Sequence, residues 1–166
     1  MKFALTIHIL VFSYLFCSGQ ENALDQGHML MSEGQLEEAL SFFNEIEGDF
    51  TNNPEFYFLR GSCLSELEQN ESAISDLSTA IRLENDNANA FYQRGFAYFT
   101  LGQSELALED FDQAILLSPT FGEAYLNRGT VQFDLGNTEA ACQDWQKALE
   151  VGLTLAEALL EQLCQD

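Results

Sequence analysis

Histidine is scarce in this chain, so few side chains could perform acid–base or metal chemistry. Two of the 166 residues are histidines, and His8 lies in an apolar run near the start. His28 is then left as the general base of any serine-type triad, and no glycine-rich nucleophile turn lies near it. Zinc motifs built on two histidines are excluded, and no phosphate-binding glycine loop is present. We therefore expect a protein without catalytic residues, metal or cofactor.

Carboxylates are abundant, with 27 Asp and Glu against six Lys and Arg and a net charge of -21. They could pair for acid–base work, but their spread along the chain is typical of a solvated surface. The stretch ENDNANA around Asp86 lacks the glycine and closing glutamate of a calcium loop, and we interpret it as a turn. The charge argues against nucleic acid as a partner.

The first 19 residues resemble a secretory signal peptide. Lys2 precedes the apolar run 3–16, and small residues follow before Gln20. The run is shorter than the roughly 20 residues of a membrane span. We expect cleavage after Gly19, export to the periplasm or outside the cell, and no membrane span in the mature chain. Lipidation at Cys17 is the alternative.

An Arg-Gly pair returns every 34 residues, at Arg60, Arg94 and Arg128. Four repeats follow from this period, spanning 20–53, 54–87, 88–121 and 122–153. Position eight of each repeat is glycine and position twenty is alanine, which would let two helix backbones approach closely. Larger side chains at positions four and twenty-four would fill the space beside them. The glycines are Gly27, Gly61, Gly95 and Gly129, and the alanines are Ala39, Ala73, Ala107 and Ala141.

The repeat predicts two antiparallel helices joined by a tight turn. Position fifteen is glycine in three repeats and Glu68 in the second, which suits a turn with positive φ. Asn70, Ser104 and Thr138 follow, and we expect them to be N-caps of the second helices.

The period and the small–large pattern resemble the tetratricopeptide repeat (TPR) family. The resemblance implies an all-α fold, a right-handed superhelical solenoid of about four helix-turn-helix repeats. Residues 154–166 would form a C-terminal capping helix over the last apolar face. The first repeat departs most from the pattern, with Ala23 and Ile46 where the others have an aromatic residue and an alanine.

The recurring arginines at position seven have aspartates at position twenty-three of the same repeat. Where the arginine is missing, at Gln26, the aspartate is missing too, at Phe42. This paired loss predicts ion pairs inside repeats two to four rather than an arginine row that holds an anionic ligand. The predicted pairs are Arg60–Asp76, Arg94–Asp110 and Arg128–Asp144.

The TPR resemblance implies that the first helices line a concave groove that binds a partner. Lysine at position five and asparagine at position nine, which grip a terminal carboxylate in some family members, do not occur here. Gln93 and Asn127 at position six could bond the backbone of a ligand. The aromatic residues at groove positions could instead belong to the core between helices. The candidate groove residues are Phe58, Tyr92, Gln93, Phe96, Phe99, Leu126, Asn127 and Phe133.

Three cysteines remain after the expected cleavage. Cys63 falls at a core position of the repeat, where we expect a buried free thiol. Cys142 faces the expected capping helix, which carries Cys164. The resemblance to exported bacterial TPR proteins with a Cys…Trp…Cys ending suggests a disulfide between these two. Two buried thiols are the alternative.

We expect an exported, non-catalytic scaffold that binds a protein or peptide segment with apolar and basic side chains. A role in self-assembly, or as an accessory subunit of an envelope complex, is the alternative. The identity of the partner and the oligomeric state stay open.

Overall fold

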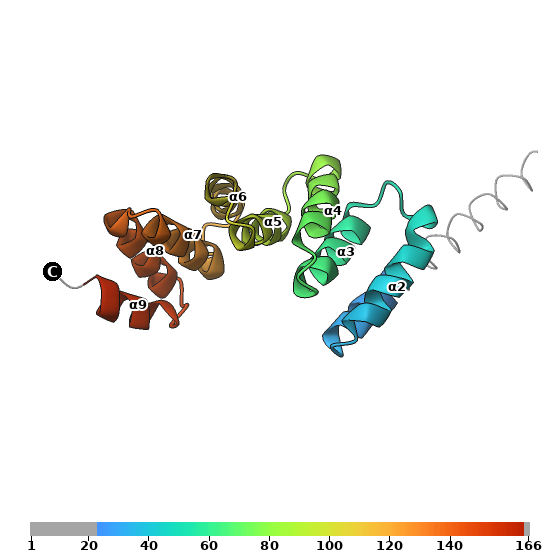
Figure 1. The fold of residues 1–166 in the computed structure, drawn as a ribbon, viewed down its shortest axis with the longest axis horizontal. Coiled ribbons are helices and arrows are strands. Elements are labelled where there is room, and N and C mark those ends of the chain that lie inside the picture. The colour runs from blue at the N-terminus through green and yellow to red at the C-terminus, as the bar shows by residue number, and fades with distance from the viewer. Residues whose placement is uncertain (1–22, 165–166) are drawn as a thin grey trace, which may run out of the picture.

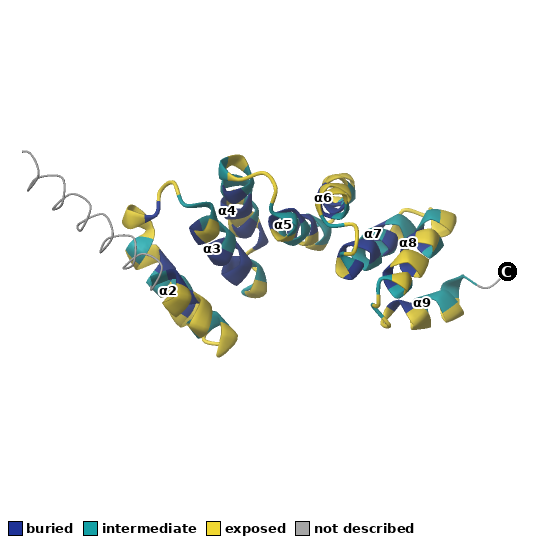
Figure 2. Cartoon of the chain, turned by 180° about the vertical axis from the view of Figure 1, so that it is seen from behind, coloured by how far each residue is buried: buried dark blue, intermediate teal, exposed yellow. Residues whose placement is uncertain are grey.

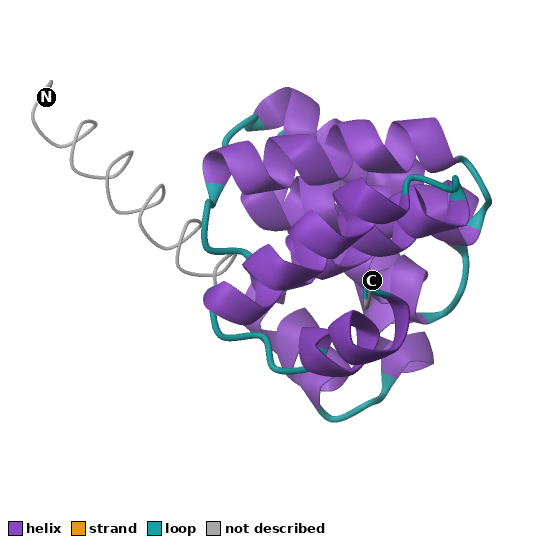
Figure 3. Cartoon of the chain, turned by 90° about the vertical axis from the view of Figure 1, so that its left-hand side faces the viewer, coloured by secondary structure: helices purple, strands orange, loops and turns teal. Residues whose placement is uncertain are grey.

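The computed structural model describes residues 23–164, and every secondary-structure element in that range is helical (Figure 3). The expected signal peptide, 1–19, lies outside the described residues. The first repeat consists of helical residues 23–32 and α2 (Leu36–Ile46), followed by the short 3-10 helix η1 (Glu47–Asp49). The later helices are α3 (Pro54–Glu66), α4 (Asn70–Leu83), α5 (Ala88–Thr100), α6 (Ser104–Leu117), α7 (Gly122–Asp134), α8 (Thr138–Glu150) and α9 (Ala156–Leu163).

The helix pairs stack in chain order into an elongated solenoid (Figure 1). In repeats two to four each first helix packs against its own second helix, and α2, α4 and α6 each pack against the first helix of the next repeat. The first helices also contact one another, α3 with α5 and α5 with α7. They therefore form a continuous layer. We call the surface of this layer that carries positions two, five, six, nine and twelve of each repeat the inner face.

Glycine at position eight allows the close helix approach that the sequence predicts. A Cβ added to Gly129 would lie 2.7 Å from Trp145 Nε1 and 3.1 Å from the backbone oxygen of Ala141. Ala73, Ala107 and Ala141 on the facing helices are fully buried. Buried residues accordingly lie where helices face one another, and exposed residues cover the outward sides (Figure 2).

The turn inside each repeat uses positive φ at position fifteen. Gly34, Gly102 and Gly136 have φ of 76°, 71° and 82°, and Glu68 adopts 60° in the same place. A side chain in this region costs about 1–2 kcal/mol relative to glycine. The packing of the helix pair therefore imposes the turn even where the sequence lacks glycine.

The expectation that Asn70, Ser104 and Thr138 are N-caps is wrong. Each is the first residue of its helix, and the side chain at the cap position one residue earlier makes no capping hydrogen bond. The reason is that the carbonyl of the preceding residue, such as Gln69, already accepts the first helical bond, from Ala73 N at 3.0 Å. The side chain that follows is then inside the helix.

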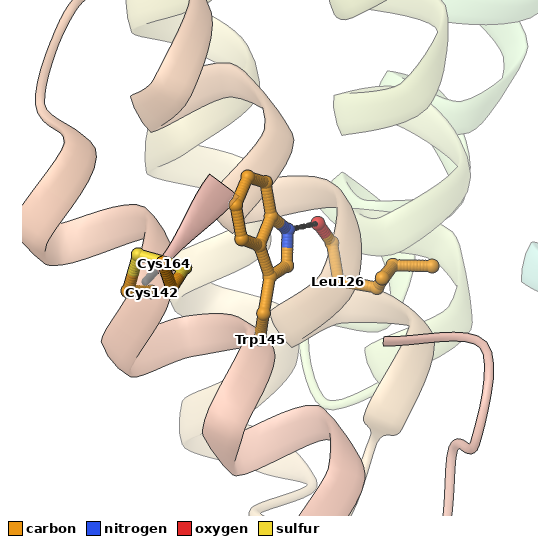
Figure 4. The surroundings of a disulfide bond; sticks show 4 residues. All are labelled: Leu126, Cys142, Trp145 and Cys164. Carbon is orange, nitrogen blue, oxygen red and sulfur yellow. Dashed lines mark hydrogen bonds between the residues drawn. A yellow bond between two sulfur atoms is a disulfide. The ribbon is translucent and has the colours of Figure 1, made fainter. Parts of the chain in front are cut away.

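The C-terminal end is closed by α9, which packs on α8. Cys142 and Cys164 form a disulfide there, with an S–S distance of 2.00 Å (Figure 4). Trp145 lies beside it, and its Nε1 donates to the carbonyl of Leu126 on α7 at 3.2 Å. The helix expected over 154–166 is thus present at Ala156–Leu163. Within residues 23–164, no helix has the length and apolar character needed to cross a membrane.

Candidate functional site

The candidate groove residues divide into exposed and packed side chains. Phe96 is 39% exposed on α5. Phe99, one turn later, packs against the cluster of Ala107, Phe111 and Val131. The core alternative therefore applies to Phe99, whereas Phe96 presents its ring to solvent. The remaining apolar members are half-buried and also pack on core clusters: Phe58, Tyr92, Leu126 and Phe133.

Tyr92 and Asn127 join the inner surfaces of repeats three and four. Asn127 Nδ2 donates to the Tyr92 hydroxyl at 2.9 Å. The Tyr92 ring is held by Phe121 and Phe111, with centroid distances of 4.8 and 5.9 Å. Burial raises the pKa of Tyr92, and the negative charge of Glu123 raises it further. The hydroxyl is therefore neutral and fixed in position at physiological pH.

Gln93 occupies the position in repeat three that Asn127 occupies in repeat four, but its surroundings differ. It is half-buried and forms no side-chain hydrogen bond with residues 23–164. The residue opposite it is Phe58, which has no hydroxyl. Of the two amides that the sequence singles out, one is thus oriented by a neighbour.

Acidic side chains surround the inner face. Glu55, Glu66, Glu123 and Asp134 on the first helices are all exposed. Of the basic residues, Lys147 pairs with Glu150 at 3.1 Å on α8, and Arg82 lies on α4. The three arginines of the first helices are engaged in ion pairs.

Each of these arginines meets the aspartate predicted for it. Arg60 Nε lies 2.6 Å from Asp76 Oδ2, Arg94 Nη2 2.7 Å from Asp110 Oδ1, and Arg128 Nη2 2.6 Å from Asp144 Oδ1. A second hydrogen bond to the other carboxylate oxygen makes every pair bidentate. The aspartates are buried, so the arginines hold helix pairs together and are not available to a ligand.

Each arginine also reaches back to the preceding repeat, which sequence reasoning missed. Nη1 of Arg60, Arg94 and Arg128 donates to Asn44, Ser78 and Asp112 respectively, each 16 residues earlier in the chain. The acceptors share a spacing and the ability to accept a hydrogen bond, but not a residue type. A polar residue 16 positions before each arginine was the available signal.

Arg60 makes an additional contact with the first repeat, to Glu47 Oε1 at 3.0 Å. Hydrogen bonding and charge attraction from Arg60 hold the pKa of Glu47 below its ordinary value. The Cys63 thiol, also on α3, donates to the carbonyl of Leu36 at 3.3 Å. It is fully buried, and burial raises its pKa to about 11. Together with the Arg60–Asn44 hydrogen bond, these contacts of α3 attach the first repeat.

The comparisons with known proteins agree with the repeat pattern. Residues 61–102 match the family described as TPR repeat, and residues 88–121 and 122–151 match the tetratricopeptide repeat. A Protein SGT1 homolog from Dictyostelium discoideum is 32% identical over 62 residues, which is 37% of this chain and 16% of that protein. The chain thus spans a small part of that relative.

Two solved structures show the same arrangement of helices. A crystal structure of MamA has a TM-score of 0.75 and 28% identity, covering 82% of this chain and 80% of that one. YrrB, described as a TPR protein with an unusual peptide-binding site, has a TM-score of 0.69 and 22% identity over 84% of this chain and 76% of its own. The chain therefore belongs to the tetratricopeptide repeat family, whose fold serves as a scaffold for protein–protein interaction.

Proposed function

We propose that the mature protein is an exported, non-catalytic scaffold that binds a segment of another protein along the inner face. The segment carries apolar side chains and lysine or arginine. The observation behind this proposal is the exposed ring of Phe96 on a face whose exposed charged residues are acidic.

An exposed aromatic ring in an acidic surrounding suits a particular kind of partner. Contiguous apolar surface rimmed by polar residues marks interaction sites, and Phe96 is flanked on α5 by the half-buried rings of Tyr92 and Phe99. An extended or helical segment could cover the Phe96 ring with an apolar side chain. Lysine or arginine on the same segment would meet the acidic residues around the face, which speeds association and selects partners by charge.

Two features support export. The pattern of Lys2, an apolar run and small residues before Gln20 is typical of a cleaved signal peptide. The Cys142–Cys164 disulfide is of a kind that persists in oxidising compartments such as the periplasm or the extracellular space.

Site-specific cross-linking tests the binding face. A photo-reactive amino acid is placed at Phe96 and, as a matched control, at Leu116, which is 71% exposed on α6. In cells that make the protein, we expect a discrete adduct with another protein from position 96 and none from position 116. Adducts from position 116 alone would place binding on the outer helices. An adduct between two copies of this chain would favour the self-assembly role.

The mass of the exported protein tests its processing. We expect an N-terminus at Gln20, free or cyclised. A diacylated chain beginning at Cys17 would instead make it a lipoprotein, and a chain that retains Met1 inside the cell would contradict export.

A further inference from the structure

We infer that Tyr92, Asn127 and Glu123 form a subsite for one lysine or arginine side chain of the bound segment. This inference rests on the binding function proposed above and assigns one class of side chain to one place on the inner face. The subsite lies between repeats three and four.

The orientation of the Asn127 amide gives the first argument. Its Nδ2 is engaged with the Tyr92 hydroxyl at 2.9 Å, while no residue in 23–164 donates a hydrogen bond to its Oδ1. The oxygen is thus left for a ligand, and a carbonyl oxygen only accepts hydrogen bonds. The group it binds must be a donor such as an ammonium, a guanidinium or a backbone N–H.

Glu123 adds a negative charge to the same place. It is exposed and lies four residues before Asn127 on α7, so both side chains share one side of the helix. It forms no ion pair within residues 23–164. Its charge is close enough to Tyr92 to raise the pKa of that hydroxyl. A carboxylate beside an amide oxygen favours a cation over a neutral donor.

The aromatic residues complete the site. Phe96 lies one turn after Tyr92 on α5, so the two rings share a side of that helix. The alkyl stem of a lysine can lie along such a surface while its ammonium stays polar. An arginine can stack its guanidinium on a ring face.

The neighbouring junction between repeats lacks the residues of this subsite. Between repeats two and three, the equivalent residues are Phe58, Gln93 and Asn89. They supply no hydroxyl, no oriented amide and no carboxylate. The same fold therefore carries the cation-binding set at one junction and lacks it at the adjacent one.

Two peptides that differ only in charge test the subsite. The probes are a short fluorescent peptide of alternating leucine and lysine and its twin with every lysine acetylated, which keeps the stem and removes the charge. We expect the mature protein to bind the lysine peptide more tightly than the twin. Glu123→Gln should weaken lysine-peptide binding about tenfold at low salt, and Tyr92→Phe about threefold, since charged hydrogen bonds exceed neutral ones.

The ratio of the two affinities separates loss of the cation subsite from a general loss of structure. Glu123→Gln and Tyr92→Phe should both reduce the preference for lysine over acetyl-lysine, whereas a structural defect would weaken both peptides equally. Glu71→Gln, at an exposed residue of α4 outside the inner face, and Tyr57→Phe, at a half-buried residue of α3, serve as controls and should leave the ratio unchanged.

The outcomes distinguish this subsite from the wider binding function. If both peptides bind equally well and Phe96→Ala abolishes binding, the inner face binds partners but the cation subsite is wrong. If the controls lower the ratio as much as Glu123→Gln does, the preference comes from overall charge and the subsite is again wrong. Failure of the mature protein to bind either peptide would overturn both.

Discussion

The first and fourth repeats share a backbone plan but are stabilised differently. The first is held by aromatic packing, with Phe43 fully buried against Gly27 and its ring 6.0 Å from that of Phe56 in the next repeat. It has no internal Arg–Asp pair, because Gln26 and Phe42 replace those residues. The fourth has the Arg128–Asp144 pair, the Trp145 hydrogen bond and the disulfide to α9.

This difference indicates an order of stability along the solenoid. Repeat proteins are stabilised by each repeat and by its contacts with neighbours, so a weak terminal repeat can open alone. The first repeat depends on contacts donated by α3, whereas the fourth is fixed from both sides. The proposed binding residues lie on α5 and α7, in the strongly held part, which suits a preorganised site.

The largest expected effect comes from filling the close helix contact in the fourth repeat. Gly129→Leu forces a side chain against Trp145 and the backbone of Ala141. We expect a loss of about 4 kcal/mol in the free energy of unfolding, because overpacking beside backbone cannot relax. Thermal denaturation followed by circular dichroism measures it.

The matching change in the first repeat sharpens the comparison. Gly27→Leu should abolish the local structure of that repeat while the remaining helices still melt cooperatively. Gly48→Ala is the control, because nothing lies within 4 Å of its added Cβ. An equal loss of cooperative stability from Gly27→Leu and Gly129→Leu would show that the two ends are equally coupled to the rest.

Removal of the disulfide should lower the stability of the C-terminal end towards that of the N-terminal end. The bond closes a loop of sequence separation 22, and such a cross-link contributes about 3 kcal/mol by the loop-entropy estimate. Cys142→Ser with Cys164→Ser should lose that amount and expose α9 to hydrogen exchange. A reducing agent should destabilise the wild type and leave the double variant unaffected. Wild-type protein with three alkylatable thiols would contradict the bond.

Substitution of Arg60 tests how the first repeat is attached at the N-terminal end of the solenoid. Arg60→Gln removes its bonds to Asn44 and Glu47 as well as to Asp76. We expect about 2 kcal/mol of lost stability, typical of hydrogen bonds to charged groups. The loss should appear as faster alkylation of Cys63, whose thiol is buried under the first repeat. Arg128→Gln should destabilise the fourth repeat without speeding that reaction, and equal rates would contradict the proposed order.

The smallest effect concerns pH. Arg60 lowers the pKa of Glu47, so this ion pair contributes stability above the carboxyl's unfolded pKa of about 4.3. The contribution is lost as the pH falls through the lower, folded value. The melting-temperature difference between wild type and Glu47→Gln should therefore shrink as the solution is acidified. In an Arg60→Gln background, Glu47→Gln should show no such pH-dependent difference, because the ion pair is already absent.

Much of the fold could be predicted from the sequence because it repeats. Glycine and alanine at fixed positions predicted the helix pairs, and the joint loss of arginine and aspartate in the first repeat predicted which side chains meet. The sequence predicted the first residue of each second helix less accurately. That start depends on which carbonyl accepts the first helical hydrogen bond, and Asn70 looks like an N-cap by residue type alone.

The candidate site was less predictable. Position in the repeat indicated the inner face but not which aromatic ring packs into the core, since Phe96 and Phe99 are the same residue type one turn apart. The bond between Tyr92 and Asn127 joins residues 35 apart in the chain. It depends on the distance between neighbouring first helices, which no local pattern specifies.

The central claim is that a partner binds along the inner face. Hydrogen exchange with and without the leucine–lysine peptide tests this claim most directly. The peptide should slow exchange in α5 and α7, which carry Phe96 and Asn127, and leave α4 and α6 unchanged. Slower exchange confined to α4, α6 or α9 would contradict the claim and move the binding site to the outer helices or the C-terminal end.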